Sequence, residues 1–155
     1  MQDIAADKFD SDRAGEYETQ SRIGLAGYDA CHELAACMLA ATLGDEPRHL
    51  LVVGAGGTGR EVRAIGALQP SWRFTAVDPS PSMLEQAVAR LRACGFADRT
   101  VAVPGYVQDV PAGVRFDAAT IIGVLHHVPG THAKMALLRS VAERLPSGAP
   151  LILAG

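Results

Sequence analysis

Apolar and polar positions alternate along the chain between two kinds of segment. Short unbroken apolar runs, typical of strands buried on both faces of a parallel sheet, occur in "HLLVVGAG", "RFTAVD", "RTVAVPGYV", "FDAATIIGVLHHV" and "APLILAG". Before and between them lie longer segments with apolar residues at helical spacing, namely "YDACHELAACMLAATLG", "GREVRAIGALQ", "PSPSMLEQAVARLRACG" and "THAKMALLRSVAERLPSG". Residues that favour helix ends agree with these limits: Gly44 follows the first helix, and Ser80 and Pro81 begin the third.

This order of one helix followed by alternating strands and helices predicts a doubly wound α/β fold, Rossmann-like, with a mostly parallel sheet. Residues 1–20 are polar and weakly patterned, and we expect a flexible N-terminal arm there and one domain over residues 21–155. The chain stops directly after a predicted strand, which would leave one flank of the sheet uncovered. Either a second copy completes the sheet in a homodimer, or the domain is C-terminally incomplete and part of a longer protein; we favour the second.

Length and charge narrow the functional classes. The 155 residues suffice for about one domain, and the net charge of −3 offers no basic surface to a nucleic acid. The N-terminus lacks the apolar core of a signal peptide, and no apolar run approaches the roughly 20 residues that span a bilayer. The cysteines and histidines show no metal-ligand spacing. We therefore expect a cytoplasmic protein without a metal site, a membrane anchor or a nucleic-acid partner.

A glycine-rich turn follows the first predicted strand. In "LLVVGAGGTGRE" the glycines at 54, 56 and 59 spell GxGxxG, a turn with which α/β proteins hold nucleotides. Asp78 ends the next predicted strand, 78 − 59 = 19 residues after Gly59, close to the spacing of about 20 expected of an acid that binds a ribose diol. The alternative is a purely structural turn, with Asp78 capping the next helix. Together the two features favour a nucleoside site, with Met83 as an apolar cover for adenine.

Four segments in this order resemble the class I S-adenosylmethionine (SAM)-dependent methyltransferases. "LLVVGAGGTG" is similar to their glycine loop, "FTAVDPSPSMLEQA" to their ribose-binding strand and helix, "FDAATIIGVLHHV" to their fourth strand, and "LLRSVAERLPSGAPLILAG" to the helix and strand that follow. The resemblance covers about residues 16–155. It implies SAM as the cofactor and methyl transfer to a small-molecule acceptor. The residues and the resemblance together give these candidate cofactor contacts: Tyr28, Gly54, Ala55, Gly56, Gly57, Gly59, Asp78, Pro79, Met83, Tyr106, Val107 and Gly123.

The segment "LAGYDACHELAACML" is similar to the start of a helix in the carboxy-SAM synthases, a group with the methyltransferase fold. That likeness implies the cofactor contact of Tyr28; packing at the helix start is the alternative. The asparagine that this group carries in its fourth strand aligns with Gly123, so the specialised chemistry of the group is not supported.

Two positions depart from the pattern of the methyltransferases. These enzymes usually carry an acid just before the glycine loop, where Val52 and Val53 stand here, so backbone carbonyls are expected to contact the amino group of the cofactor. An aspartate usually bonds the adenine amino group at the position of Tyr106. That contact is left to Tyr106 itself, to Val107 or to Asp109.

Methyl transfer from SAM depends on alignment and exclusion of water more than on acid–base groups, which suits a sequence with no evident catalytic dyad. His126 and His127, in the loop after the fourth strand, are candidates for a base that deprotonates the acceptor; a structural role in the loop is the alternative. We interpret His32, His49 and His132 as surface or packing residues. Two other functions stay open: an NAD-dependent oxidoreductase, from the literal GxGxxG, and a non-catalytic methyltransferase-like domain that serves as a binding or scaffold subunit.

Overall fold

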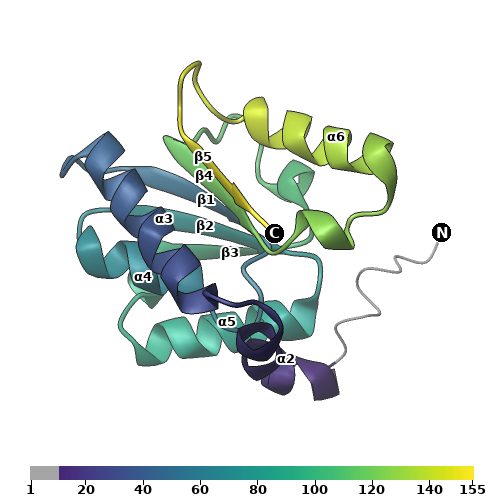
Figure 1. The fold of residues 1–155 in the computed structure, drawn as a ribbon. Coiled ribbons are helices and arrows are strands. Elements are labelled where there is room, and N and C mark those ends of the chain that lie inside the picture. Colours follow the sequence, from purple (N-terminus) through teal and green to yellow (C-terminus); the bar gives the residue numbers. More distant parts are fainter. Residues whose placement is uncertain (1–10) are drawn as a thin grey trace.

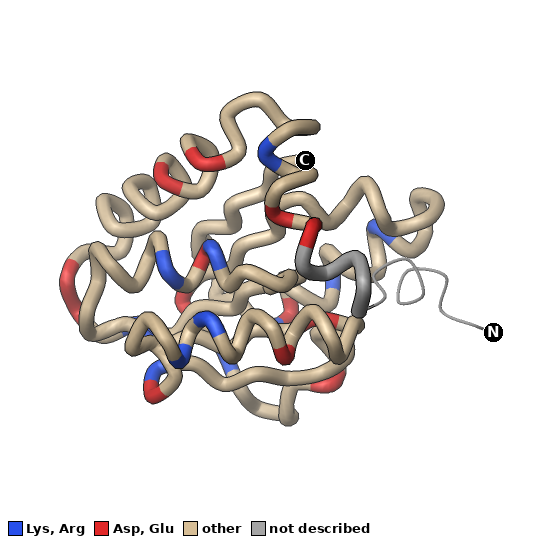
Figure 2. The backbone as a smooth tube through the Cα atoms, turned by 90° about the horizontal axis from the view of Figure 1, so that it is seen from below, with Lys and Arg blue, Asp and Glu red and all other residues tan. Residues whose placement is uncertain are grey.

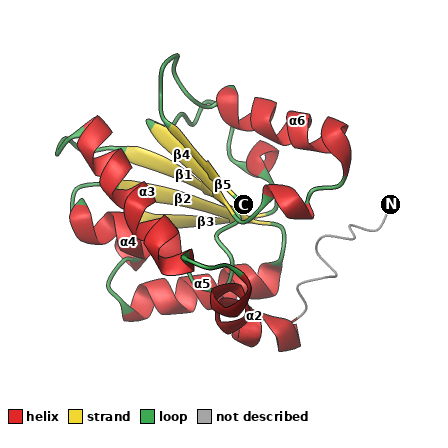
Figure 3. Cartoon of the chain, in the orientation of Figure 1, coloured by secondary structure: helices red, strands yellow, loops and turns green. Residues whose placement is uncertain are grey.

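The computed structural model describes residues 11–155, and side chains from residue 16 onward. A five-stranded sheet lies at its centre, and every pair of neighbouring strands is parallel (Figures 1 and 3). The strand order is β3-β2-β1-β4-β5. The strands are β1 (His49–Val53), β2 (Arg73–Asp78), β3 (Thr100–Pro104), β4 (Ala118–Ile122) and β5 (Leu151–Ala154). The prediction of a doubly wound α/β fold with a parallel sheet is confirmed.

Helices cover both faces of the sheet (Figure 1). On one face α3, α4 and α5 pack on the strands, and on the other face lies α6. The α-helices are α2 (Ser11–Gly24), α3 (Tyr28–Leu43), α4 (Arg60–Leu68), α5 (Pro81–Ala93) and α6 (Gly130–Ala142); short 3-10 turns are η1 (Ala97–Arg99), η2 (Val107–Asp109) and η3 (Leu125–His127). The central strand β1 therefore has an apolar layer on each side.

The burial of β1 explains its unbroken apolar sequence. Successive side chains of a strand point to opposite faces of the sheet. Leu50 and Val52 pack with α3, α4 and α5, whereas Leu51 and Val53 belong to the cluster that includes Val141 of α6. Because both faces are covered, a polar side chain at any position of β1 after His49 would be buried, which costs free energy unless it finds a hydrogen-bond partner.

The predicted helix ends are confirmed. Gly44 follows α3 with a φ of 69°, and its N–H donates to the carbonyl of Ala40. Ser80 caps α5, since its hydroxyl accepts from the backbone N–H of Met83, and Pro81 occupies the first helical position. Gly44 ends α3 shortly before β1, whereas Ser80 starts α5 directly after β2, at the carboxyl edge of the sheet.

Helix α2 begins at Ser11, inside the segment expected to be a flexible arm. The flexibility of the arm over residues 1–20 stays a prediction; residues 11–20 are helical, and residues 1–10 lie outside the described part of the chain. The side chain of Glu18 joins this helix to α5, because its carboxylate accepts a hydrogen bond from Arg90 at 2.7 Å. Within α2 the same carboxylate forms an ion pair with Arg22 at 2.7 Å. Polar contacts of this kind leave no apolar periodicity in the sequence.

Strand β5 forms one edge of the sheet, and Leu151 and Leu153 on it are 37% and 49% exposed. Completion of the sheet by a second copy stays a prediction. Figure 2 shows Lys and Arg interspersed with Asp and Glu along the described backbone. Within residues 11–155, no helix has the length and apolar character to cross a membrane, and no three His, Cys, Asp or Glu side chains gather in a way that could hold a metal ion.

Candidate functional site

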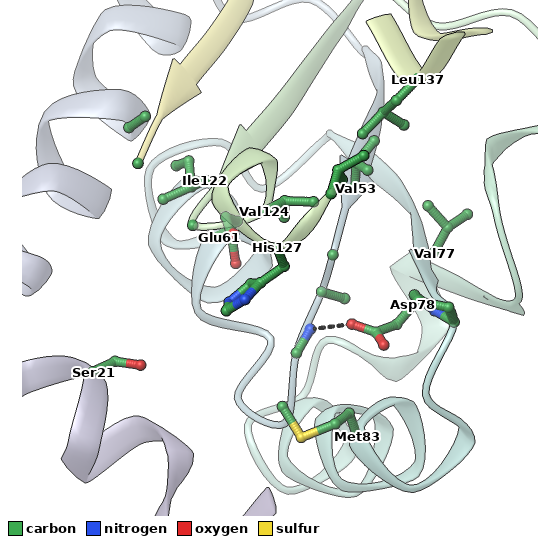
Figure 4. A pocket seen from close by; sticks show the side chains of 18 of the residues that line it. Ser21, Val53, Glu61, Val77, Asp78, Met83, Ile122, Val124, His127 and Leu137 are labelled. Atoms are coloured by element: carbon green, nitrogen blue, oxygen red, sulfur yellow. Dashed lines mark hydrogen bonds between the residues drawn. The ribbon is translucent and has the colours of Figure 1, made fainter. Parts of the chain in front are cut away.

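A cavity of about 630 Å³ opens at the carboxyl ends of the strands (Figure 4). It lies where β1 has β2 on one side and β4 on the other, the topological switch point at which open α/β sheets bind their ligands. Its walls come from the glycine loop after β1, the end of β2, the loops after β3 and β4, and the helices α2, α3 and α6. Segments far apart in the sequence thus meet around one hollow.

The glycine loop approaches its neighbours too closely for side chains. Gly54 and Gly56 have φ values of 71° and 60°, in the left-handed region that favours glycine. A Cβ on Gly54 would also collide with Val124, in the loop after β4. The loop is held to the end of β2, because the N–H groups of Gly54 and Ala55 both donate to the carbonyl of Val77. The bare backbone of this loop therefore forms part of the cavity wall.

Asp78 lies at the end of β2, beside this loop, and is 7% exposed. Its Oδ2 accepts from the backbone N–H of Gly56 at 2.9 Å, drawn in Figure 4, and its Oδ1 accepts from the N–H of Ser80 at 2.8 Å. Burial raises the pKa of Asp78, and these two donors act in the opposite direction. Each carboxylate oxygen has a second lone pair. Asp78 thus fastens the glycine turn and can still accept a hydrogen bond from a ligand.

Met83 and Val107 contribute apolar side chains to the cavity, and we call the part that they line the apolar slot. Met83 of α5 and Val107 of η2 are 2% and 1% exposed, while Tyr106 is 37% exposed. The carboxylate of Asp109 accepts from the backbone N–H of Tyr106 at 2.7 Å, and Asp109 is not among the lining residues. Its carboxylate is engaged within its own turn, which leaves Tyr106 and Val107 as candidates for the adenine contact.

Arg144, just beyond α6, is hydrogen-bonded to the loop that carries Val107. Its guanidinium donates to the carbonyls of Val110 and Pro111, each at 2.7 Å, and reaches the carbonyl of Val107 at 3.4 Å. One side chain thus satisfies several backbone acceptors of a segment with little regular structure. The wall of the slot depends on a residue that lies outside the cavity itself.

Most of the predicted site residues meet in the cavity. The ones that line it are Tyr28, Gly54, Ala55, Gly56, Asp78, Pro79, Met83, Tyr106, Val107 and Gly123, together with His127. Gly57, Gly59 and His126 do not line it. Gly59 precedes α4 with a φ of 57°, and a Cβ there would lie 2.8 Å from Leu91, so this glycine serves the packing of α4 on α5. The ring of His126 packs on that of His127 with centroids 3.9 Å apart.

The structure adds lining residues that the sequence patterns did not indicate, above all Glu61 in the first turn of α4 and His32 on α3. Glu61 is 5% exposed, and burial raises its pKa to about 8. His32 was expected to be a surface or packing residue; it is buried, and it stands at the cavity wall. Tyr28 of α3 and Thr58 of the glycine loop both line the cavity.

In the described part of the chain, the cavity is lined by carboxylic acids rather than by strongly basic side chains. Among the described residues that line it there are two carboxylic acids, Asp78 and Glu61, and no lysine or arginine. Arg60, next to Glu61 in sequence, forms ion pairs with Asp29 and Glu33 of α3 instead, at 3.2 and 3.7 Å. A cavity with this lining is suited to a neutral or cationic ligand and disfavours an anion.

The parallel sheet and the cavity at its switch point define a Rossmann-like α/β domain with a cavity at the place where this fold binds its ligands. Residues 51–151 match the family described as "Methyltransferase domain", and the chain belongs to this family. The resemblance to the class I methyltransferases is thereby confirmed at the level of family and fold.

Individual relatives agree with this assignment. The chain is 35% identical over 107 residues to demethylspheroidene O-methyltransferase of Cereibacter sphaeroides, a match that covers 69% of this chain and 27% of that protein. A solved structure of a proposed SAM-dependent methyltransferase of Methanococcus maripaludis has a TM-score of 0.74 at 19% identity, covering 95% of this chain and 64% of the other. A SAM-dependent methyltransferase of Geobacter sulfurreducens in complex with S-adenosylhomocysteine has a TM-score of 0.60 at 20% identity, covering 78% and 46%. The chain thus spans about a quarter to two thirds of the length of these proteins.

Proposed function

We propose that the cavity binds SAM and that the protein transfers its methyl group to a small-molecule acceptor. One observation carries the proposal: a buried acid, Asp78, stands against the glycine turn in a cavity whose described lining has acids and no lysine or arginine. SAM is a nucleoside whose amino-acid tail carries a sulfonium cation, an ammonium group and a carboxylate, so its net charge is positive. Its sugar needs an acceptor for the diol, and its net positive charge favours a wall with acids over one with lysine or arginine.

Each part of the ligand has a candidate partner in the cavity. Asp78 would accept from the ribose hydroxyls through the lone pairs that Gly56 and Ser80 leave free. Met83 and Val107 would enclose the adenine ring in their apolar slot. The donor set and the charge of the cavity both fit the group.

The same features argue against NAD as the ligand. A dinucleotide places its diphosphate on the N-terminus of the helix after the glycine turn. Here that first turn carries the buried Glu61, and the N–H of Gly56 already donates to Asp78. A diphosphate would have to displace one contact and lie beside two carboxyl groups.

SAM supplies a methyl group activated by the sulfonium charge, so the protein mainly aligns the acceptor and excludes water. Apolar side chains of the loop after β4 and of α6, among them Val124, Val128 and Leu137, line the part of the cavity that an acceptor would occupy. His127 lines the same region and could take a proton from a hydroxyl or amine; His126 lies outside it. We therefore retain only His127 as a candidate base.

Titration calorimetry with S-adenosylhomocysteine on Asp78→Ala tests the proposal. Loss of a carboxylate that bonds a ribose diol should weaken binding by about 1–3 kcal/mol, or roughly 5- to 150-fold. Asp117→Ala is the matched control, because Asp117 also accepts a backbone N–H, that of His49 at 2.8 Å, but at the amino end of β1. Its dissociation constant should match that of the wild type. An unchanged constant in Asp78→Ala, or binding of NADH in place of S-adenosylhomocysteine, would refute the proposal.

A further inference from the structure

The proposed contacts to ribose and adenine leave one buried pair of polar side chains unused. Glu61, 5% exposed, points into the cavity from α4 (Figure 4), and His32, 3% exposed, faces it from α3. The Nε2 of His32 lies 3.8 Å from Oε1 of Glu61. The Nδ1 of His32 lies 2.8 Å from the carbonyl oxygen of Tyr28, so Nδ1 carries the proton and donates, and the lone pair of Nε2 faces Glu61.

Both members of this pair are uncharged near neutral pH in the ligand-free protein. Burial raises the pKa of Glu61 to about 8, the charge of Asp78 adds to this, and the Glu61 backbone N–H and Arg60 oppose it. Burial lowers the pKa of His32. The contact at 3.8 Å is therefore not an ion pair. A carboxyl group has been buried at the cavity wall with no cation among the described lining residues to balance it.

Other titratable groups face Glu61 from the neighbouring elements. Tyr17 of α2 and Tyr28 of α3 both have a pKa raised by burial, with Glu61 as a further cause, so both stay neutral throughout the range in which Glu61 titrates. Asp78 faces it from the end of β2. This surrounding of neutral and acidic groups would gain most from a ligand that brings its own positive charge.

We propose that Glu61, backed by His32, binds the ammonium group on the amino-acid tail of the ligand. The inference rests on the proposed function. It replaces the expectation that backbone carbonyls alone receive this group, which followed from Val52 and Val53 standing where related proteins carry an acid. Here the acid comes from α4, the helix that follows the glycine loop. The two carboxyl groups would then hold the two polar ends of one ligand.

Binding should expel a proton. The ammonium keeps its charge, Glu61 loses its proton to the solvent, and the pair becomes a carboxylate beside a cation. For a group with a pKa near 8 that is ionised in the complex, affinity should rise about 20-fold between pH 6.0 and 7.5, a range in which the ligand stays an ammonium. Calorimetry of wild type with S-adenosylhomocysteine, in buffers of different ionisation enthalpy, should show release of close to one proton.

Glu61→Gln and a ligand without the tail complete the test. Glu61→Gln should bind S-adenosylhomocysteine at least about 10-fold more weakly at pH 7.5, with no proton release. It should bind 5′-methylthioadenosine, which lacks the whole amino-acid tail and with it the ammonium, as wild type does. Glu33→Gln is the matched control, since Glu33 lies near Arg60 at 3.7 Å but is 70% exposed and outside the cavity.

The outcomes separate the two proposals. Equal binding of S-adenosylhomocysteine by wild type and Glu61→Gln, or an equal loss for both nucleosides, would overturn the role of Glu61 while nucleoside binding stands. Absence of proton release in the wild type would overturn it without reference to any variant. If neither nucleoside binds the wild type, the proposed function falls, and this inference with it.

Discussion

The buried carboxyl of Glu61 should make the ligand-free protein less stable as the pH rises. The folded protein holds this group with a pKa near 8, against an ordinary value of 4.5. Between these values the folded state binds a proton that the unfolded state has released. By linkage, stability then falls with rising pH: the contribution is complete below about pH 4.5 and is lost by about pH 8. Glu61→Gln keeps the shape of the side chain and removes the titration.

The size of the effect follows from the two pKa values. One pH unit corresponds to about 1.4 kcal/mol for one proton, and slightly less as the pH approaches the folded pKa. Between pH 6.5 and 7.5 the wild type should therefore lose about 1 kcal/mol of unfolding free energy through Glu61. Asp78, whose pKa burial also raises, and His32, whose pKa burial lowers, are present in both proteins. The difference between wild type and Glu61→Gln thus isolates Glu61.

Urea unfolding followed by circular dichroism, at several pH values without ligand, measures this difference. Glu61→Gln should be more stable than wild type at pH 7.5, and the gap should narrow as the pH is lowered. A gap that does not change with pH would refute the reasoning, because it would place the titration of Glu61 in the folded protein at its ordinary value. A stabilised variant that binds its ligand more weakly would show a polar group retained for binding at a cost in stability.

Two further substitutions test how the loops around the cavity are held. Gly54→Ala adds a Cβ against Val124 at a φ of 71°, so denaturant titration should show a loss of about 2–3 kcal/mol in unfolding free energy. Adding Val124→Ala should restore the part of this loss that comes from the clash and leave the part that comes from the backbone conformation. No recovery in the double variant would contradict the contact. Arg144→Met removes the donors to the carbonyls of Val110 and Pro111, so unfolding free energy should fall by about 2–4 kcal/mol. Binding of S-adenosylhomocysteine should weaken as well, because the loop that carries Val107 would shift. Unchanged stability would show that Arg144 does not hold this loop.

Much of the fold could be predicted because its signals are local. The four residues of β1 after His49 are all buried, which explains why the strand is continuously apolar. Gly44, Ser80 and Pro81 lie at the helix ends that their chemistry favours. Helix α2 could not be predicted in the same way. It contacts α5 through Glu18 and Arg90, and ion pairs between distant segments leave no periodic pattern.

The same distinction applies to the site. Asp78 was found because a fixed spacing from a glycine turn marks it, whereas Glu61 has the position of an ordinary acid in the first turn of a helix, where exposed carboxylates are common. Its burial is decided by α3, which packs on α4 and brings His32 within 3.8 Å of it, and these two residues are 61 − 32 = 29 positions apart in the chain. A glutamate that directly follows a glycine turn is thus ambiguous in sequence. In a chain whose valines replace the usual acid before the turn, the missing carboxylate should be sought on the neighbouring helix.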